Sequence, residues 1–199
     1  SSGTTLYELT SAYSAFANMG RLIKPTAIRN IKNRDGEVLF TSVPEITQPI
    51  SPGTAHIITS LMESVIQHGT ATKVKALKRP VAGKTGTTNN YVDAWFMGYT
   101  PELVTGVWVG KDKDEPLGRN ETGSRAAIPI WLDYMKSALS KTPIYNFPVT
   151  HETMFAKINP DTGRLTDPED PNGYFEIFLK DNLPNKQNNQ EENITGKTF

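Results

Sequence analysis

Three β-rich segments lie close together in the middle of the chain, at residues 81–88, 94–100 and 103–110. The first two are joined by residues 89–93, and the last two by Pro101-Glu102 alone. Connections this short leave no room for a parallel crossover, so neighbouring strands must run antiparallel. The sequence therefore predicts a three-stranded antiparallel meander.

Both faces of this sheet are predicted to be apolar. Trp95, Met97 and Tyr99 alternate with Ala94 and Phe96, so apolar side chains point to either side of the second strand. A sheet that is apolar on both faces must be covered by a layer on each. Helices are expected to form these layers.

Three segments have apolar residues at steps of three and four, which is the spacing of a half-buried helix: residues 4–19, a segment from Pro52 to His68, and residues 125–140. Pro52 suits the first turn of a helix, and Gly20 can take the left-handed conformation that ends the first one. The predicted fold class is α/β of the α+β type, with an antiparallel sheet flanked by helices.

The segments between these elements are interpreted from their turn residues and charges. Residues 27–33 and 37–42 flank Arg34-Asp35-Gly36, which predicts a hairpin. The basic stretch from Lys73 to Arg79 is interpreted as a solvated loop, and the polar residues 111–123 as a surface loop.

Composition excludes several classes of function. Lys plus Arg and Asp plus Glu both number 21, so the net charge is zero, and neither nucleic acid nor an anionic membrane is an expected partner. The absence of cysteine excludes disulfides, zinc–thiolate sites and thiol nucleophiles. His56 and His68 have no carboxylate at metal-ligand spacing, so no metal and no cofactor is predicted. Apolar runs are too short for a membrane span in these residues.

Gly83-Lys84-Thr85 allows two interpretations. A phosphate-binding loop would end in these residues, but it requires a glycine five positions before Gly83, where this chain has Lys78. It also requires a helix directly after Thr85, and the residues that follow are poor helix formers. A nucleotide-binding function therefore fails on two independent counts.

The second interpretation is Lys84-Thr85-Gly86 on a strand, a motif of serine β-lactamases and penicillin-binding proteins. Gly86 removes a side chain where a substrate could approach the backbone. Lys84 offers a positive charge, and the hydroxyls of Thr85 and Thr87 offer two neutral donors. These three groups are expected to converge on one carboxylate.

With Lys84-Thr85-Gly86-Thr87-Thr88 as its centre, the sequence resembles the transpeptidase domain of class A, bifunctional penicillin-binding proteins. The resemblance extends over nearly all residues to about 180 and is carried by residues 5–13, 79–88, 93–101, 107–110, 127–131, 147–148 and 158–163. It implies the fold of serine β-lactamases and penicillin-binding protein transpeptidases, here in its C-terminal portion.

The resemblance also implies an activity, that of a D,D-transpeptidase that cross-links peptidoglycan on the outer side of the bacterial cell membrane. Its partners would be peptidoglycan stem peptides and β-lactams. Lys84, Thr85 and Thr87 would hold the substrate's terminal carboxylate, and Gly86 belongs to the same substrate-binding strand. The backbone N–H of Thr87 would be one of the two donors of the oxyanion hole.

Two motifs of the family are absent from the 199 residues. No serine is followed by lysine in a Ser-x-x-Lys pattern, and no Ser-x-Asn occurs. The resemblance places both motifs before Ser1, together with a glycosyltransferase domain and a membrane anchor. The chain alone is therefore expected to be inactive and to need the missing N-terminal half of the domain. The alternative is a non-catalytic, peptidoglycan-binding or scaffolding module of the same fold, and the sequence preceding Ser1 would distinguish the two.

The resemblance and the composition together give an expected division of the chain. Residues 1–145 are expected to form the C-terminal part of the transpeptidase domain, and residues 146–180 an extension of it. Within the extension, a strand is predicted at residues 154–158 and a turn at 159–163. Residues 181–199 contain many Asn and Gln and are expected to form a disordered tail.

Overall fold

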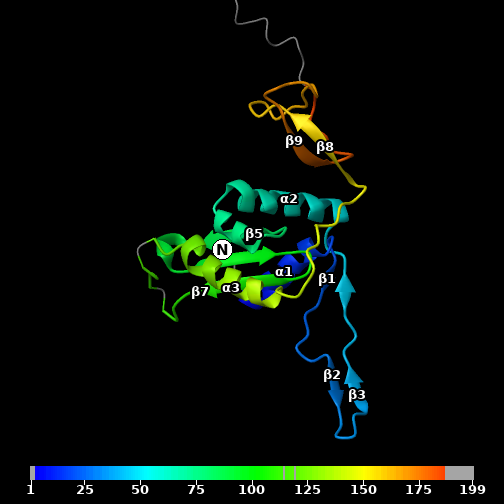
Figure 1. Cartoon of the computed structure of the whole chain (residues 1–199), viewed down its shortest axis with the longest axis vertical. Coiled ribbons are helices and arrows are strands. Elements are labelled where there is room, and N and C mark those ends of the chain that lie inside the picture. Colours follow the sequence, from blue (N-terminus) through cyan, green and yellow to red (C-terminus); the bar gives the residue numbers. More distant parts are fainter. Residues whose placement is uncertain (1–2, 114, 119, 187–199) are drawn as a thin grey trace, which may run out of the picture. The chain divides into compact units, whose positions relative to one another are not determined.

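The structure, a computed structural model, describes residues 3–113, 115–118 and 120–186 (Figure 1). It contains two compact units, the first ending at Val149 and the second beginning at Thr150. The sequence placed this division at residue 145, and that boundary stays a prediction. Among the described residues, no helix has both the length and the apolar content needed to cross a membrane.

The first unit is built on a three-stranded sheet. Its strands are β5 (Ala82–Thr87), β6 (Ala94–Tyr99) and β7 (Val104–Val109), which lie side by side in that order. Both pairs are antiparallel. The predicted meander is confirmed.

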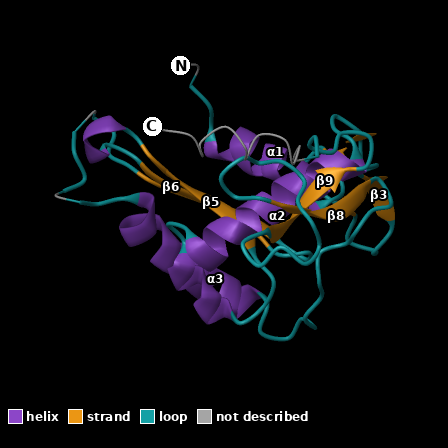
Figure 2. Cartoon of the chain, turned by 90° about the horizontal axis from the view of Figure 1, so that it is seen from above, coloured by secondary structure: helices purple, strands orange, loops and turns teal. Residues whose placement is uncertain are grey.

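Helices cover both faces of this sheet, as predicted (Figure 2). The helices are α1 (Leu6–Ala17), α2 (Pro52–His68) and α3 (Ile128–Ala138). Helix α1 brings Tyr13 to Tyr99, with ring centroids 6.5 Å apart. On the opposite face, Trp131 of α3 meets Phe96 edge-on, with ring centroids 5.1 Å apart. Because Phe96 and Tyr99 point to opposite sides of β6, the two helices form separate layers.

The main core lies between β6, α2 and α3. Phe96, Ile66, Trp131 and Met135 are buried there, and Trp131 has no exposed surface. The indole N–H of Trp131 donates to the carbonyl oxygen of Thr105 at 3.0 Å, so burial leaves this polar atom satisfied. This packing fixes the sheet against α3.

The ends of the first helix follow from its sequence. Thr5 caps α1, since its hydroxyl accepts from the N–H of Glu8 while the Glu8 carboxylate accepts from the N–H of Thr5. Gly20 has a φ of +84°, the left-handed conformation predicted for it. Beyond it, the predicted hairpin is present as β2 (Asn30–Lys32) and β3 (Val38–Thr41). A short pairing of β1 (Leu22–Ile23) with β4 (Ile46–Thr47) was not anticipated.

The prediction of a solvated loop from Lys73 to Arg79 is only partly correct, since the three lysines are exposed but the segment is not a loop. Residues Thr72–Leu77 form a 3₁₀ helix, and Val74 within it is completely buried. Only 9 % of the Arg79 side chain is exposed, because it pairs with the carboxylate of Glu102. Apolar residues lie between the charged residues of this segment, and they turn it toward the core.

The predicted helix at residues 125–140 also differs in detail. The chain enters it through a π-helical turn, η3 (Gly123–Ala127), before α3 begins at Ile128. Such a turn is a local widening of a helix and is often found at functional sites. Residues 111–123 were predicted as a surface loop; Gly123 belongs to η3, and the described residues before it form no strand or α-helix.

The second unit is a hairpin of β8 (Thr153–Ile158) and β9 (Tyr174–Leu179). The predicted strand at residues 154–158 is confirmed, whereas β9 was missed. In the predicted turn, the Asn159 side chain accepts from two backbone N–H groups, and Gly163 has a φ of +66°. Of the tail expected to be disordered, residues 187–199 lie outside the described residues, and Lys186 forms a β-bridge with Leu165.

Candidate active site

The candidate site lies along the open edge of β5. On its other edge β5 pairs with β6, where the N–H of Thr88 donates to the carbonyl of Asp93 at 3.2 Å just beyond the strand end. Bonded and non-bonded residue pairs alternate along an antiparallel ladder. The backbone of Gly86 is therefore hydrogen-bonded to β6, whereas the backbone N–H and C=O groups of Thr85 and Thr87 point to the open edge.

Of the predicted site residues, the three that have side chains divide between the two faces of β5. Thr85 lies opposite Phe96 in the register, so Thr85 and Thr87 share the face that α3 covers. Lys84 starts from the other face, but its ammonium donates to the carbonyl of Thr85 at 2.7 Å. Because the Thr85 carbonyl points to the open edge, the ammonium also lies at this edge. The structure thus places the two hydroxyls on one face of β5 and the positive charge at its open edge.

Two residues that the sequence did not single out contact these hydroxyls. The hydroxyl oxygen of Thr70, in the loop after α2, lies 2.8 Å from that of Thr85. The N–H of Gly123, in η3, donates to the Thr87 hydroxyl at 3.2 Å. No sequence signal joins these residues to β5, because Thr70 and Gly123 are respectively 15 and 36 positions from their partners.

Two glycines allow close packing at this end of the sheet. A Cβ atom at Gly86 would lie 3.1 Å from the Cβ of Trp95, so the glycine makes room for the neighbouring indole. A Cβ atom at Gly123 would collide with the carbonyl oxygen of Trp95 and come within 2.8 Å of that of Gly86. Gly123 therefore lets η3 pack directly on the β5–β6 backbone, which brings its N–H to Thr87.

The turn after β5 is held by side-chain hydrogen bonds. The Thr88 hydroxyl accepts from the N–H of Asp93 at 2.8 Å, and the Asp93 carboxylate accepts from the indole N–H of Trp108 at 2.8 Å. Trp108 in turn lies against Trp95, with ring centroids 6.1 Å apart. These contacts fix the end of β5, and with it the direction of the Thr87 N–H.

The charge at the open edge favours an anion. Lys84 is the only ionisable group among the four site residues, and the hydroxyls and outward N–H groups beside it are neutral donors. Burial raises the pKa of Tyr99 above its ordinary value. That residue, however, is paired with Ala82, at the end of β5 farthest from Thr87. The described residues contain no group of three His, Asp or Glu side chains able to hold a metal ion.

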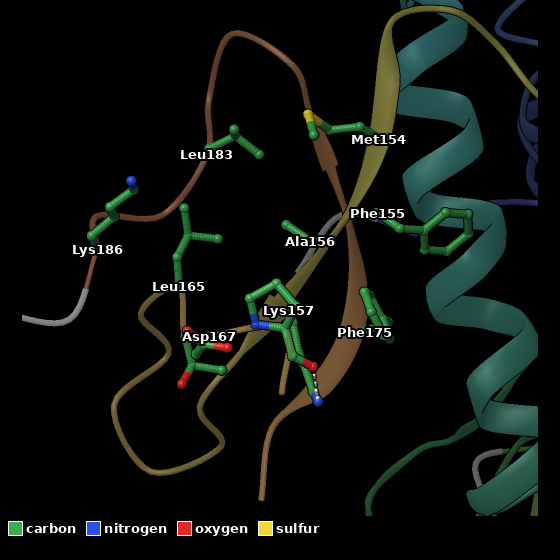
Figure 3. Close-up of a pocket in the computed structure, with 11 residues that line it drawn as sticks. Met154, Phe155, Ala156, Lys157, Leu165, Asp167, Phe175, Leu183 and Lys186 are labelled. Atoms are coloured by element: carbon green, nitrogen blue, oxygen red, sulfur yellow. Dashed lines mark hydrogen bonds between the residues drawn. The ribbon is translucent and has the colours of Figure 1, made fainter. Parts of the chain in front are cut away.

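A separate cavity of about 570 Å³ lies in the second unit, beside β8 (Figure 3). Its walls include Met154, Leu165 and Leu183, and Lys157 donates to the carbonyl of Pro168 at 2.7 Å. None of the site residues predicted from the sequence lines it. The candidate active site is therefore the β5 edge in the first unit.

Comparison with known proteins identifies the family. Residues 2–136 match the penicillin binding protein transpeptidase domain. The chain belongs to the penicillin-binding protein transpeptidase family. Penicillin-binding protein 1A of Aquifex aeolicus is 41 % identical over 180 residues, and that of Pseudomonas aeruginosa is 34 % identical over 231; each match covers 90 % of this chain. The chain spans about a quarter of the length of these relatives (25 % and 28 %).

Solved structures of the family share the fold. A 2.6 Å crystal structure of penicillin-binding protein 1A from Haemophilus influenzae matches with a TM-score of 0.85 at 29 % identity, over 93 % of this chain and 33 % of that one. PonA1 from Mycobacterium tuberculosis matches with a TM-score of 0.59 at 32 % identity, over 70 % of this chain and 40 % of that one. The predicted fold class, a penicillin-binding protein transpeptidase fold with an antiparallel sheet flanked by helices, is confirmed.

Proposed function

We propose that this chain supplies one wall of a serine D,D-transpeptidase site, in which the β5 edge binds a stem peptide or a β-lactam. The observation that carries the proposal is the open edge of β5, where the hydroxyls of Thr85 and Thr87, the ammonium of Lys84 and the outward N–H of Thr87 lie within one short segment. Such an edge can pair with an extended peptide backbone, while its donors hold the terminal carboxylate.

The proposed reaction is an acyl transfer in two steps. A serine hydroxyl attacks the carbonyl of the penultimate D-Ala, its proton passes to the departing amine, and the terminal D-Ala leaves. The amine of a neighbouring stem peptide then attacks the acyl-enzyme and releases the serine. In each step the carbonyl oxygen becomes negative, and the N–H of Thr87 donates to it. A β-lactam acylates the same serine by opening its ring.

The nucleophile must come from residues outside this chain, because none of its serines begins a Ser-x-x-Lys motif.

The open edge of β7 indicates where a second segment of the domain could pack. The N–H of Thr100 donates to the carbonyl of Leu103 at 3.0 Å, so by alternation the backbone groups of Val104 and Gly106 face away from β6. A cavity of about 680 Å³, bounded by α1, β7 and the exposed Tyr134, lies beside this edge.

We propose that the remainder of the transpeptidase domain packs on this β7 edge and completes the active site. Unpaired strand edges and apolar hollows of this kind are normally covered in the folded protein. The same upstream part of the protein would carry the anchor that holds the domain at the outer side of the bacterial membrane. The proposal is tested on the complete protein, meaning this chain joined to the segment that carries the nucleophile.

The proposal is tested with Thr87→Val, which removes the hydroxyl and keeps the branched shape that a strand favours. Loss of a hydrogen bond to a charged group costs about 1.5–3 kcal/mol, so the acylation rate with a fluorescent penicillin should fall about tenfold to a hundredfold. Thr87→Ser should restore most of the rate. A penicillin whose carboxylate is converted to a carboxamide should show a smaller loss.

Thr72→Val, a change at an exposed position, is the matched control and should leave the acylation rate unchanged. Acylation of Thr87→Val at the wild-type rate, or an equal loss with the carboxamide, would show that this hydroxyl does not bind the carboxylate. Such a result would favour the non-catalytic scaffold of the same fold.

A further inference from the structure

We infer that Thr70 is a positioning residue of this site: it donates its hydroxyl hydrogen to Thr85, which leaves the Thr85 hydrogen free for the carboxylate of the ligand. The inference rests on the proposed function of the β5 edge and adds to it a residue from a different element. Thr70 lies in the loop between α2 and the 3₁₀ helix η1 (Thr72–Leu77).

The direction of the hydrogen bond follows from the chemistry of the groups. The two hydroxyl oxygens are 2.8 Å apart, the usual distance for a hydroxyl–hydroxyl bond, and such a bond uses one hydrogen of the two. A carboxylate can only accept, so a carboxylate bound at Thr85 takes the Thr85 hydrogen. Thr85 can then only accept from Thr70. The chain of donors runs from Thr70 to Thr85 to the ligand, and each bond in it polarises the next.

The backbone holds Thr70 in place although its side chain is exposed. On one side, the N–H groups of Gly69 and Ala71 both donate to the carbonyl of Val65, at 3.0 and 3.4 Å. On the other side, Ala71 and Val74 are completely buried. A residue fixed on both sides can present its hydroxyl to β5 without first being ordered by the ligand.

The second hydroxyl of the site is arranged in the same way. Thr87 accepts from the backbone N–H of Gly123, a group that can only donate. Its own hydrogen is therefore also directed elsewhere. With each hydroxyl already accepting one hydrogen bond, both direct their own hydrogens to the ligand, so the side chains of this edge act on the ligand as donors. This favours a carboxylate over a carboxamide, because the amide brings donors of its own.

The test measures the second-order rate of acylation of the complete protein by a fluorescent penicillin and by its carboxamide. Thr70→Val should lower the rate with the carboxylate compound about three- to tenfold, the effect of one hydrogen bond. The rate with the carboxamide should change less than twofold, so the preference for the carboxylate should shrink. Thr70→Ser should restore the wild-type preference, and Thr72→Val, a change two positions away at the start of η1, should leave both rates as they are.

A double-mutant cycle with Thr85→Val separates this inference from the proposed function. Thr70→Val should add nothing further once Thr85 has lost its hydroxyl. If Thr85→Val slows acylation but Thr70→Val does not, the role of Thr70 is overturned while the proposed function stands. If Thr85→Val has no effect, both fail. An equal loss with the two compounds, or a matching loss of thermal stability in Thr70→Val and Thr70→Ala, would mean a structural role only and would overturn the inference.

Discussion

A buried ion pair ties the start of β5 to the chain beyond α3, and its removal should strongly destabilise the first unit. Arg79 and Glu102 lie 3.6 Å apart (Nη1 to Oε1), with side chains 9 % and 12 % exposed. Arg79 also donates to the carbonyls of Leu139 and Thr142 at 3.3 and 3.1 Å, and Glu102 accepts from the N–H of Tyr145 at 3.2 Å. The pair thus anchors the segment that follows the last helix.

The perturbation is Glu102→Gln, which keeps the size of the side chain and removes its charge. Removing one partner of a buried pair costs about 3–5 kcal/mol, because the other charge stays buried without compensation. Arg79 retains its two carbonyl acceptors, so we expect the low end of this range, about 3 kcal/mol. Arg79→Met combined with Glu102→Leu should cost less than the two single changes added together, since no charge is then left unpaired.

The assay is urea unfolding followed by tryptophan fluorescence, with Lys24→Met as the matched control. Lys24 forms an ion pair with Glu45 at 3.3 Å, but both side chains are largely exposed, so its loss should cost less than about 1 kcal/mol. If Glu102→Gln destabilises the protein no more than Lys24→Met does, burial of the Arg79–Glu102 pair is not what holds this segment.

Trp131→Ala removes the largest fully buried side chain and should lower the free energy of unfolding by about 3–5 kcal/mol in the same assay. Burial raises the pKa of Tyr99, so the folded state disfavours its ionised form. The contribution of Tyr99 to stability should therefore be constant below about pH 10 and fall as the pH rises above it, by up to about 1.4 kcal/mol per pH unit, and Tyr99→Phe should make the alkaline loss of stability shallower in urea titrations. Residues 1–199 alone, incubated with a penicillin, should show no adduct in intact-mass analysis, and a stoichiometric adduct on any serine of the chain would contradict the assignment.

The sequence predicted what depends on local patterns. The short connections around β6 required an antiparallel meander. Phe96 and Met97 lie on opposite faces of the sheet, and these two apolar faces required helices on both sides. The structure has the meander and the two helical layers. The basic stretch ending at Arg79 was misinterpreted, because the burial of Arg79 depends on its pairing with Glu102. Glu102 is distant in the sequence and contacts Arg79 only in the folded chain. Strand β9 was missed although its aromatic and aliphatic residues favour a strand, since only one strand and a turn were predicted in this extension.

The site was predictable only in part, for a physical reason. Lys84, Thr85, Gly86 and Thr87 are contiguous, so a strand motif could reveal them together, and the structure places all four on the open edge of β5. Thr70 and Gly123 contact the same hydroxyls from other elements, and no spacing rule connects them to β5. Contacts of this kind depend on how α2 and η3 pack against the sheet.

The most direct test of the proposed site is a crystal structure of the complete protein acylated by a penicillin. We predict that the acyl carbonyl oxygen lies about 2.7–3.1 Å from the backbone nitrogen of Thr87. We also predict that the carboxylate of the antibiotic accepts hydrogen bonds from the hydroxyls of Thr85 and Thr87. An acyl group bound away from the β5 edge, or a carboxylate held by other residues, would contradict the proposed site.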